Sequence, residues 1–487
     1  MKNSLSNNKN PIYIRIYEEI KSRILCGDIL PGTRLQSKRV MSALHGYSVN
    51  TIDSAYQQLV SEGYIEARPK SGFFVSDPGP IARSPDFSKE ILPRTAFMSD
   101  EPHRSADDFR VDFSPNAVDM DAFPLSRLRK IVKECFDKRA GEILCSYDAA
   151  GSYDLRTSLC RYLETARGLT CRPDQIVIGA GTDFVLQLIM QIIRSDTPVN
   201  AIAMENPLYN KAFQIFSGMG ISVRLIPVGK EGLRTDLLRQ SDADIVYLTP
   251  SHQFPLGVIL PIHKRSDILS WASQKENRYI IEDDYDSEFR YVGRPIPPIG
   301  EADRNGRVIY LGTFSKSIAP SIRISYLVLP ERLLAAFRKN LAFYAATVSS
   351  IDQIVLSRFI DSGDFERHIS RMRTLYRKKR DVLLGALAQY RHELTIRGTD
   401  AGLHLIVTVS NGMTESDLVA NAAAKGIRVY GISSYYIDTG DPHLFIRPGT
   451  VLLGYAGLSE DQITYGVKQL VEAWNLSSLH DSNTPDT

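Results

Sequence analysis

Short apolar segments alternate with longer amphipathic segments along most of the chain, from Phe109 to about Leu476. The apolar segments are rich in β-branched residues; they are QIVIGA, AIAMEN, VRLIPV, DIVYLTP, RYIIEDD, VIYLGTFS and ISYLVLP. Such alternation predicts an α/β fold, a mostly parallel sheet with helices on both faces. From about Thr395, the segments LHLIVTV, IRVYGIS and TVLLGYA lie beside helical patterns and predict a smaller α+β lobe.

Residues 1–76 carry a different pattern. Ile16, Ile20 and Ile24 recur on one face of a helix predicted over residues 13–27. A serine begins each of the next two amphipathic segments, SKRVMSALHG and SVNTIDSAYQQLVSEG, as helix caps do. GYIEARPKSGFFVSD then predicts strand, turn and strand. Together they predict a winged helix-turn-helix, mostly α with a β wing, and a small helical domain for protein contacts stays open as the alternative.

The segment between these two regions, residues 77–108, is rich in Pro, Ser and mixed charge and has no sustained periodicity, so it predicts a linker. The predicted domains are therefore 1–76, which is the winged helix-turn-helix, and 109–476, in which residues from roughly 340 onward join the N-terminal part in the small lobe. Residues 477–487 form a polar tail.

Composition narrows the possible partners and compartment. The 487 residues carry a net charge of only +2, so nucleic-acid binding would need a local basic patch. The five cysteines have no CxxC spacing, which argues against a disulfide framework or a zinc site. No apolar signal core and no run of 18 apolar residues are present, so we expect a cytoplasmic protein outside the membrane.

Polar residues gather where the predicted strands end, the edge at which parallel sheets bind ligands. Lys316 directly follows VIYLGTFS, and a lysine amine forms an imine with an aldehyde such as that of pyridoxal 5'-phosphate (PLP). Asp283 could hold the ring nitrogen of that cofactor, and Tyr209 could stack on its ring. The phosphate needs amides, hydroxyls and a guanidinium, which could come from Gly181, Thr182, Ser315 and Arg323. A lone lysine after a strand is usually a solvated charge, but the combination predicts PLP as the cofactor.

Over Pro11 to Val75 the chain resembles the GntR regulator family, because LPGTRLQSKRV, NTIDSAYQQLVSEGYI and SGFFV stand in that family's order and spacing. The resemblance implies binding to double-stranded DNA through Arg39, Ser48, Asn50, Thr51, Lys70 and Gly72. Val49 and Asp53 depart from the family, which often has arginines there, and the carboxylate could repel phosphate. We therefore expect the phosphate contacts to depend on Arg34, Lys38, Arg39 and Lys70.

From Phe109 onward the chain resembles fold-type I aminotransferases, and as a whole it resembles the MocR subgroup of GntR regulators. The matching segments are SYDAAGSYDLRTSLCRYLETARGL, TPSHQFPLGVILP, IIEDDYDSEFRY and GTFSKSIAPSIRISYLVLP. The resemblance implies that Lys316 forms the Schiff base and that Asp283 pairs with the pyridine nitrogen. It further implies that Tyr285 and Gln253 reach the ring hydroxyl, that Tyr209 stacks on the ring, and that Gly181, Thr182, Ser315 and Arg323 hold the phosphate.

Two positions depart from that family. Asp183 stands where glutamine is commoner, and a carboxylate there suits a phosphate site only if it caps the following helix and points away. Leu452 stands where catalytic aminotransferases place the arginine for the substrate α-carboxylate. Without that arginine an amino-acid substrate loses a bidentate ion pair and much of its orientation.

These observations predict a PLP-dependent DNA-binding transcriptional regulator that senses PLP, a small amine or an amino acid. We expect at most weak aminotransferase activity. Because fold-type I domains usually build their sites at a dimer interface, the resemblance implies a homodimer that binds a promoter with two half-sites. The alternative is an active aminotransferase that carries a DNA-binding head.

Overall fold

The computed structural model describes residues 11–77, 109–145, 147–437 and 447–477. The chain divides into two compact units, Met1–His103 and Arg104–Thr487, which we call the head and the body. Apart from the edge residues 77 and 477, the predicted linker and tail lie outside the described residues. Within the described ranges, no helix combines the length and the apolar character needed to cross a membrane.

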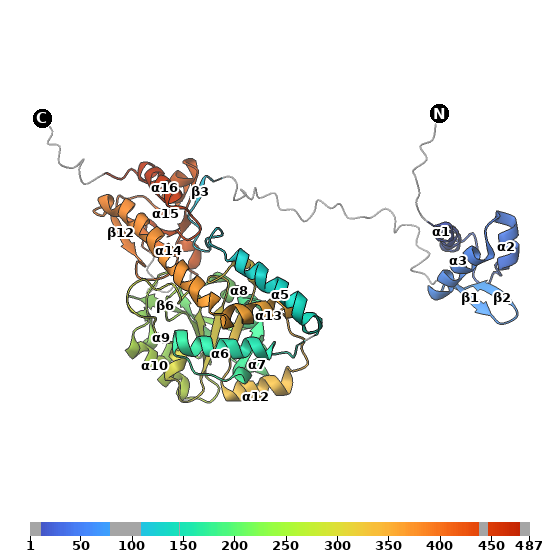
Figure 1. Cartoon of the computed structure of the whole chain (residues 1–487), viewed down its shortest axis with the longest axis horizontal. Coiled ribbons are helices and arrows are strands. Elements are labelled where there is room, and N and C mark those ends of the chain that lie inside the picture. Colours follow the sequence, from blue (N-terminus) through green and yellow to red (C-terminus); the bar gives the residue numbers. More distant parts are fainter. Residues whose placement is uncertain (1–10, 78–108, 146, 438–446, 478–487) are drawn as a thin grey trace. The chain divides into compact units, whose positions relative to one another are not determined.

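The head consists of three helices followed by a two-stranded antiparallel wing (Figure 1). Its elements are α1 (Ile12–Leu25), α2 (Lys38–His45), α3 (Val49–Ser61), β1 (Ile65–Arg68) and β2 (Gly72–Val75). The isoleucines that define the stripe of α1 are buried against Ile52, Tyr56 and Leu59 of α3. The winged helix-turn-helix predicted from the sequence is therefore confirmed, with α1 ending two residues earlier than expected.

The body contains an eight-stranded sheet in the order β4-β11-β10-β9-β8-β5-β6-β7. The strands are β4 (Ile176–Gly179), β5 (Ala201–Asn206), β6 (Ser222–Gly229), β7 (Gly232–Leu233), β8 (Ile245–Leu248), β9 (Tyr279–Asp284), β10 (Val308–Thr313) and β11 (Ser325–Val328). Neighbours from β10 to β6 are parallel, whereas β11 runs antiparallel to both β10 and β4. The carboxyl ends of β4, β5, β8, β9 and β10 therefore lie along one edge.

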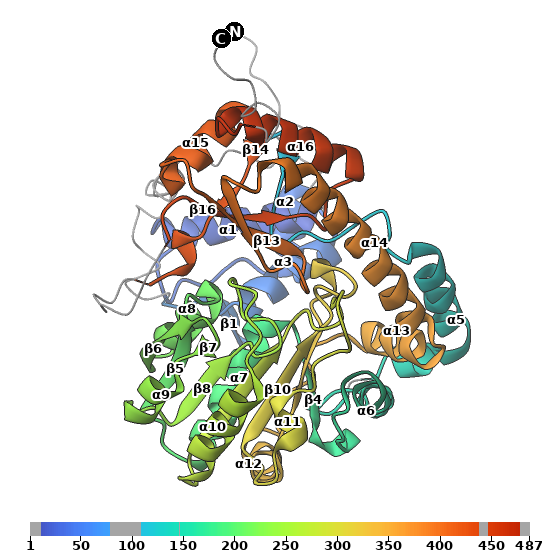
Figure 2. The same ribbon diagram turned by 90° about the vertical axis from the view of Figure 1, so that its left-hand side faces the viewer.

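Helices cover both faces of this sheet (Figure 2). On one face pack α7 (Thr182–Asp196), α8 (Asn210–Gly218) and α12 (Glu331–Asn340). The other face is covered by α5 (Leu125–Ile143), α6 (Tyr153–Arg167), α9 (Thr235–Gln240), α10 (Ile262–Ser273), α11 (Ile299–Ala302) and α13 (Ser350–Asp361). Short 3-10 turns occupy Pro173–Gln175, Pro320–Ile322, Ala388–Tyr390 and Ser433–Tyr435.

The small lobe is a four-stranded antiparallel sheet with helices. It comprises α14 (Asp364–Leu387), β12 (Leu394–Arg397), β13 (His404–Val409), α15 (Glu415–Ala424), β15 (Tyr430–Gly431), β16 (Thr450–Gly454) and α16 (Glu460–Ala473). IRVYGIS, expected as one strand, is divided, because β14 (Ile427–Arg428) pairs with β3 (Val111–Asp112) and β15 pairs with β16. The chain thus changes its pairing partner at Val429, and the residues that follow the linker join this lobe.

Candidate cofactor cavity and nucleic-acid interface

A cavity of about 250 Å³ opens at the carboxyl edge of the large sheet. Seven of the sequence-predicted residues line it: Thr182, Tyr209, Asp283, Tyr285, Ser315, Lys316 and Arg323. They come from segments that follow β4, β5, β9, β10 and the turn before β11. Because these strand ends share one edge, residues spread over some 140 positions of the sequence meet in one place.

Lys316 enters the cavity from the turn after β10. Its Nζ donates to the Asn116 side-chain oxygen at 3.1 Å and to the Pro115 carbonyl at 3.3 Å. Burial lowers the pKa of this amine to about 8, and the carboxylate of Asp286 opposes that shift. A larger fraction of the amine is therefore unprotonated near neutral pH than for a lysine in water, which favours attack on an aldehyde.

Asp283 lies at the end of β9 and is almost fully buried. The Tyr247 hydroxyl donates to its Oδ2 at 2.5 Å, while its Oδ1 has no hydrogen-bond partner among the described residues. Burial raises the pKa of this carboxyl group to about 7. A buried carboxylate oxygen without a partner is costly, and a cationic ring N–H is the kind of donor that would satisfy it.

The phosphate candidates lie at the start of α7 and beside it. Gly181, the residue before α7, has a φ of 85°, and a Cβ added there would lie 2.5 Å from the Arg323 guanidinium. Only glycine leaves that space open. Arg323 itself has a φ of 52° and donates to the Asp183 carboxylate at 3.1 Å. Thr182 Oγ1 lies 3.4 Å from the hydroxyl of Ser325, and the hydroxyls of Thr313 and Ser315 are 3.2 Å apart.

Aromatic rings form another wall of the cavity. Tyr209 meets the Phe254 ring edge-on with centroids 6.3 Å apart, and burial raises the pKa of its hydroxyl to about 12. The Tyr285 hydroxyl lies 3.0 Å from His252 Nδ1, which also contacts Asp286 at 2.8 Å. Tyr209 and Tyr285 therefore stay neutral at physiological pH and can stack or donate a hydrogen bond.

Gln253 is the one side chain of the predicted cofactor set that does not line this cavity. It is fully buried, and its amide nitrogen donates to the carbonyls of Pro207 and Phe254, at 2.9 and 2.7 Å. Its oxygen accepts from the Leu256 amide at 3.0 Å. These bonds hold the loop that presents Phe254, so the structure gives Gln253 a supporting position rather than one inside the cavity.

The predicted DNA-contact residues lie on the turn before α2, on α2, at the start of α3 and on the wing. Arg34, Arg39, Asn50 and Lys70 are exposed. Ser48 caps α3, since its hydroxyl accepts from the Thr51 amide at 3.1 Å and lies 2.7 Å from the Thr51 hydroxyl. A Cβ on Gly72 would come within 3.3 Å of the Arg34 side chain, so the wing packs closely beside that arginine.

Asp53, the acidic residue that departs from the family, has a cationic partner on the head. It forms an ion pair with Lys38, whose ammonium group also lies 5.0 Å from the centroid of the Phe73 ring. The carboxylate that departs from the family is thereby neutralised within the head. The same pairing engages Lys38, one of the lysines expected to contact phosphate.

Comparisons with known proteins describe the same two parts. The model of the bacterial regulatory proteins of the gntR family matches residues 12–75, and the model of aminotransferase class I and II matches residues 110–470. The chain is similar to the uncharacterized HTH-type transcriptional regulator YhdI of Bacillus subtilis (strain 168), with 38% identity over 96% of each chain. It is also 29% identical to the probable rhizopine catabolism regulatory protein MocR of Rhizobium meliloti, over 95% of this chain and 94% of that protein. The chain belongs to the MocR subgroup of the GntR family.

The body of this MocR-type chain has the fold of aminotransferases. It resembles the crystal structure of a multiple substrate aminotransferase from Thermococcus profundus, with a TM-score of 0.65 and 26% identity over 76% of this chain and 92% of that one. The aminotransferase class I and II family depends on PLP. The unpartnered Asp283 oxygen, the low-pKa lysine and the glycine that makes room for Arg323 fit that cofactor.

Sequence reasoning missed several residues that line the cavity of the MocR-type body. They are Asn116, Asp183 as a lining residue, Lys211, Tyr247, Thr249, Phe254, Thr313 and Pro320. Thr249 and Phe254 follow β8, so the strand-end rule that selected Asp283 could have found them. Asn116 comes from the other end of the body, 200 positions before Lys316, and no local pattern marks it.

Leu452 lies in the middle of β16 and is fully buried. It packs with Ile406 and Ile432, and Tyr435 joins the same cluster. The Tyr435 ring contacts that of Phe254 at a centroid distance of 5.2 Å, so this apolar cluster adjoins the cavity wall. The position at which the resemblance predicts the loss of a carboxylate-binding arginine is therefore apolar in its surroundings as well as in its own side chain.

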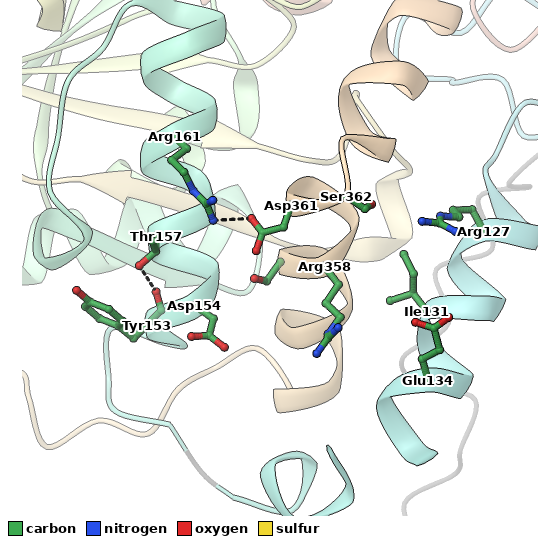
Figure 3. A pocket seen from close by; sticks show the side chains of 11 residues that line it. Arg127, Ile131, Glu134, Tyr153, Asp154, Thr157, Arg161, Arg358, Asp361 and Ser362 are labelled. Carbon is green, nitrogen blue, oxygen red and sulfur yellow. Dashed lines mark hydrogen bonds and ion pairs between the residues drawn. The ribbon is translucent and has the colours of Figure 1, made fainter. Parts of the chain in front are cut away.

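A larger cavity of about 560 Å³ lies between α5, α6 and α13 (Figure 3). Two of its three arginines pair with acidic neighbours: Arg161 donates to Asp361 at 2.8 Å, and Arg127 pairs with Asp364. No lysine is among the residues that line it. Size alone therefore does not locate the chemistry, and the smaller cavity at the sheet edge remains the candidate cofactor site.

Proposed function

We propose that this chain is a PLP-dependent, DNA-binding transcriptional regulator of the cytoplasm. In this proposal the body senses PLP, alone or with a small amine or amino acid, and the head binds double-stranded DNA. One observation carries the sensor half: the cavity combines a low-pKa lysine with a buried carboxylate oxygen that has no partner among the described residues, and an apolar cluster adjoins its wall where the resemblance expects the substrate clamp. The relatives named above, which match at least 95% of this chain, support the DNA-binding half.

Different residues of the cavity would bind different parts of the cofactor. Lys316 would bind its aldehyde carbon covalently, and Asp283 would accept a hydrogen bond from its ring N–H. Thr182, Ser315, Arg323 and the backbone at Gly181 would hold the phosphate, while Tyr209 stacks and Tyr285 donates to the ring oxygen. When bound, PLP supplies an electron-withdrawing ring and an aldehyde that exchanges between amines.

Regulation needs two arrangements of the protein with different affinities for DNA. A coupling of about 1–3 kcal/mol, or about 5- to 150-fold in affinity, is typical for such switches. We propose a homodimer whose two heads contact two half-sites. In this structure the free Lys316 amine contacts residues 115 and 116, and these contacts would differ between a lysine held covalently by the cofactor and a free one.

An active aminotransferase is the second candidate, because the lysine and the carboxylate are those that the reaction needs. One experiment separates the two. DNA footprinting upstream of the protein's own gene, with and without PLP and amines, is run beside a multiple-turnover amino-transfer assay for wild type and Lys316→Ala. The regulator predicts PLP-dependent footprints that the variant lacks, with slow turnover. Fast turnover, together with a footprint that is the same with and without PLP and in wild type and Lys316→Ala, would favour the enzyme.

A further inference from the structure

Asp183 places a negative charge at the end of the cavity where a phosphate would bind. It is the second residue of α7 and lines the cavity together with Thr182 and Arg323. Its carboxylate accepts a hydrogen bond from the Arg323 guanidinium at 3.1 Å. The guanidinium expected to bind phosphate thus already has an anionic partner within the protein.

The carboxylate of Asp183 is not used to cap the helix. The residue before the helix is Gly181, which has no side chain to cap it, and within the described residues no side chain accepts a hydrogen bond from a first-turn amide of α7. The first turn therefore keeps its amides for a ligand, whereas Asp183 is directed to Arg323. An acidic residue here suits a phosphate site only if it caps the helix and points away. Asp183 does not meet that condition in this structure.

Two anions would compete for one cation at this place. A phosphate monoester carries a charge of about −1.5 to −2 at neutral pH, and helix amides together with a guanidinium form a suitable site for it. When the phosphate binds, Arg323 must leave Asp183 or share its donors between the two anions. In either case a carboxylate and a phosphate come to lie close together, and like charges at such short range repel.

We propose that Asp183 is a built-in competitor for Arg323 that weakens phosphate binding and so raises the PLP concentration at which the cavity fills. The inference rests on the proposed function, because it concerns the affinity of the same cavity for PLP. It adds a specific role to a residue that the family resemblance does not explain. A sensor needs an affinity close to the concentration that it reports, and an internal anion is a direct way to set that affinity.

The test compares Asp183→Asn, which removes the charge, with Asp183→Glu, which keeps it. The matched control is Asp236→Asn, because Asp236 also lies in the first turn of a helix and pairs with an arginine, Arg234, at 2.5 Å, away from the cavity. Equilibrium binding of PLP and of pyridoxal, which lacks the phosphate, is measured by the absorbance of the lysine-bound cofactor. Thermal melting without ligand reports the folding of each variant, and Asp183→Gln serves if the asparagine variant does not fold.

We expect Asp183→Asn to bind PLP about 10-fold more tightly than wild type, a usual size for removing one repelling charge from a partly exposed site. Its affinity for pyridoxal should stay within about twofold of wild type, since no phosphate is present. Asp183→Glu and Asp236→Asn should both resemble wild type. The gain should shrink as salt rises from about 0.05 to about 0.5 M, because ions screen exposed charges.

Two results would overturn the inference. One is unchanged or weaker PLP binding by a folded Asp183→Asn protein, and the other is an equal gain for pyridoxal, which would show that the phosphate is not involved. Failure of the proposed function would look different. In that case neither wild type nor any variant would bind PLP through Lys316, and no adduct would remain after borohydride reduction.

Discussion

The cavity in the body and the DNA-contact surface of the head hold their charged groups in opposite ways. In the cavity, Lys316 is half-buried and Asp283 is almost fully buried, and burial moves the pKa of the amine down to about 8 and that of the carboxyl group up to about 7. On the head, Arg39 and Lys70 are exposed to solvent, while Lys38 and Asp53 pair with each other. In the proposed function the cavity would bind one kind of ligand covalently, whereas the exposed cations of the head would bind a polyanion.

The largest effect should come from removing the lysine. Lys316→Ala should lose the adduct that borohydride fixes on the protein, because the substitution removes the amine expected to form the imine. Intact mass spectrometry after reduction with PLP measures the adduct. Lys211→Ala is the matched control, since Lys211 lines the same cavity, and it should keep the adduct. A reducible adduct on the alanine variant at position 316 would show that the cavity was wrongly assigned.

DNA binding should depend on exposed cations and little on the paired one. Arg39→Ala and Lys70→Ala should each weaken binding by about 5- to 50-fold and lower the slope of log affinity against log salt by about 1. Lys38→Ala should cost less than about threefold, because its ammonium already pairs with Asp53. Binding to a mixed-sequence duplex and to the DNA upstream of the gene is titrated at several salt concentrations. Equal losses of DNA affinity for all three variants would contradict the prediction that exposed cations contribute more than the paired one.

The pH dependence of adduct formation should report the lysine. Only the unprotonated amine attacks an aldehyde, and a pKa of about 8 leaves about a tenth of it unprotonated at pH 7. The rate of adduct formation with PLP should therefore rise about tenfold between pH 7 and pH 9 and level off above the pKa. Free Nα-acetyllysine is the control, and its rate should keep rising toward pH 10. A protein profile that follows the free amino acid would contradict a buried, low-pKa amine.

The smallest expected effect concerns the choice between amines and amino acids. With Leu452 in an apolar cluster, PLP-loaded protein should bind phenethylamine more tightly than phenylalanine, which adds only a carboxylate. Leu452→Arg should shift this ratio toward the amino acid by about fivefold, because a guanidinium can pair with that carboxylate. Titrations followed by the visible absorption of the cofactor measure both ligands. Leu452→Met controls for side-chain size, and a ratio that is the same in all three proteins would exclude Leu452 from the ligand site.

The sequence predicted the strands and the residues at their ends because each buried strand is bounded locally by glycine, proline or polar residues. Lys316, Asp283 and Arg323 could therefore be predicted from the sequence alone, and the fold and family are confirmed. Asn116 and Lys211 could not be predicted in this way. Asn116 lies 200 positions before Lys316 in the sequence, and Lys211 lies on α8, whose direction depends on packing. On the head, the Lys38–Asp53 pair was missed because two residues 15 positions apart meet only after α2 packs against α3.

The contact between Asn116 and Lys316 also brings the cavity close, in sequence, to the end of the predicted winged helix-turn-helix at residue 76. Every other residue that lines the cavity comes at position 182 or later, at least 106 positions beyond residue 76, whereas Asn116 is only 40 positions beyond it. Eight of those positions separate Asn116 from residue 108, a backbone span of at most about 29 Å. Whatever displaces this asparagine from the amine therefore acts on residues 109–116, the stretch that directly follows the predicted linker.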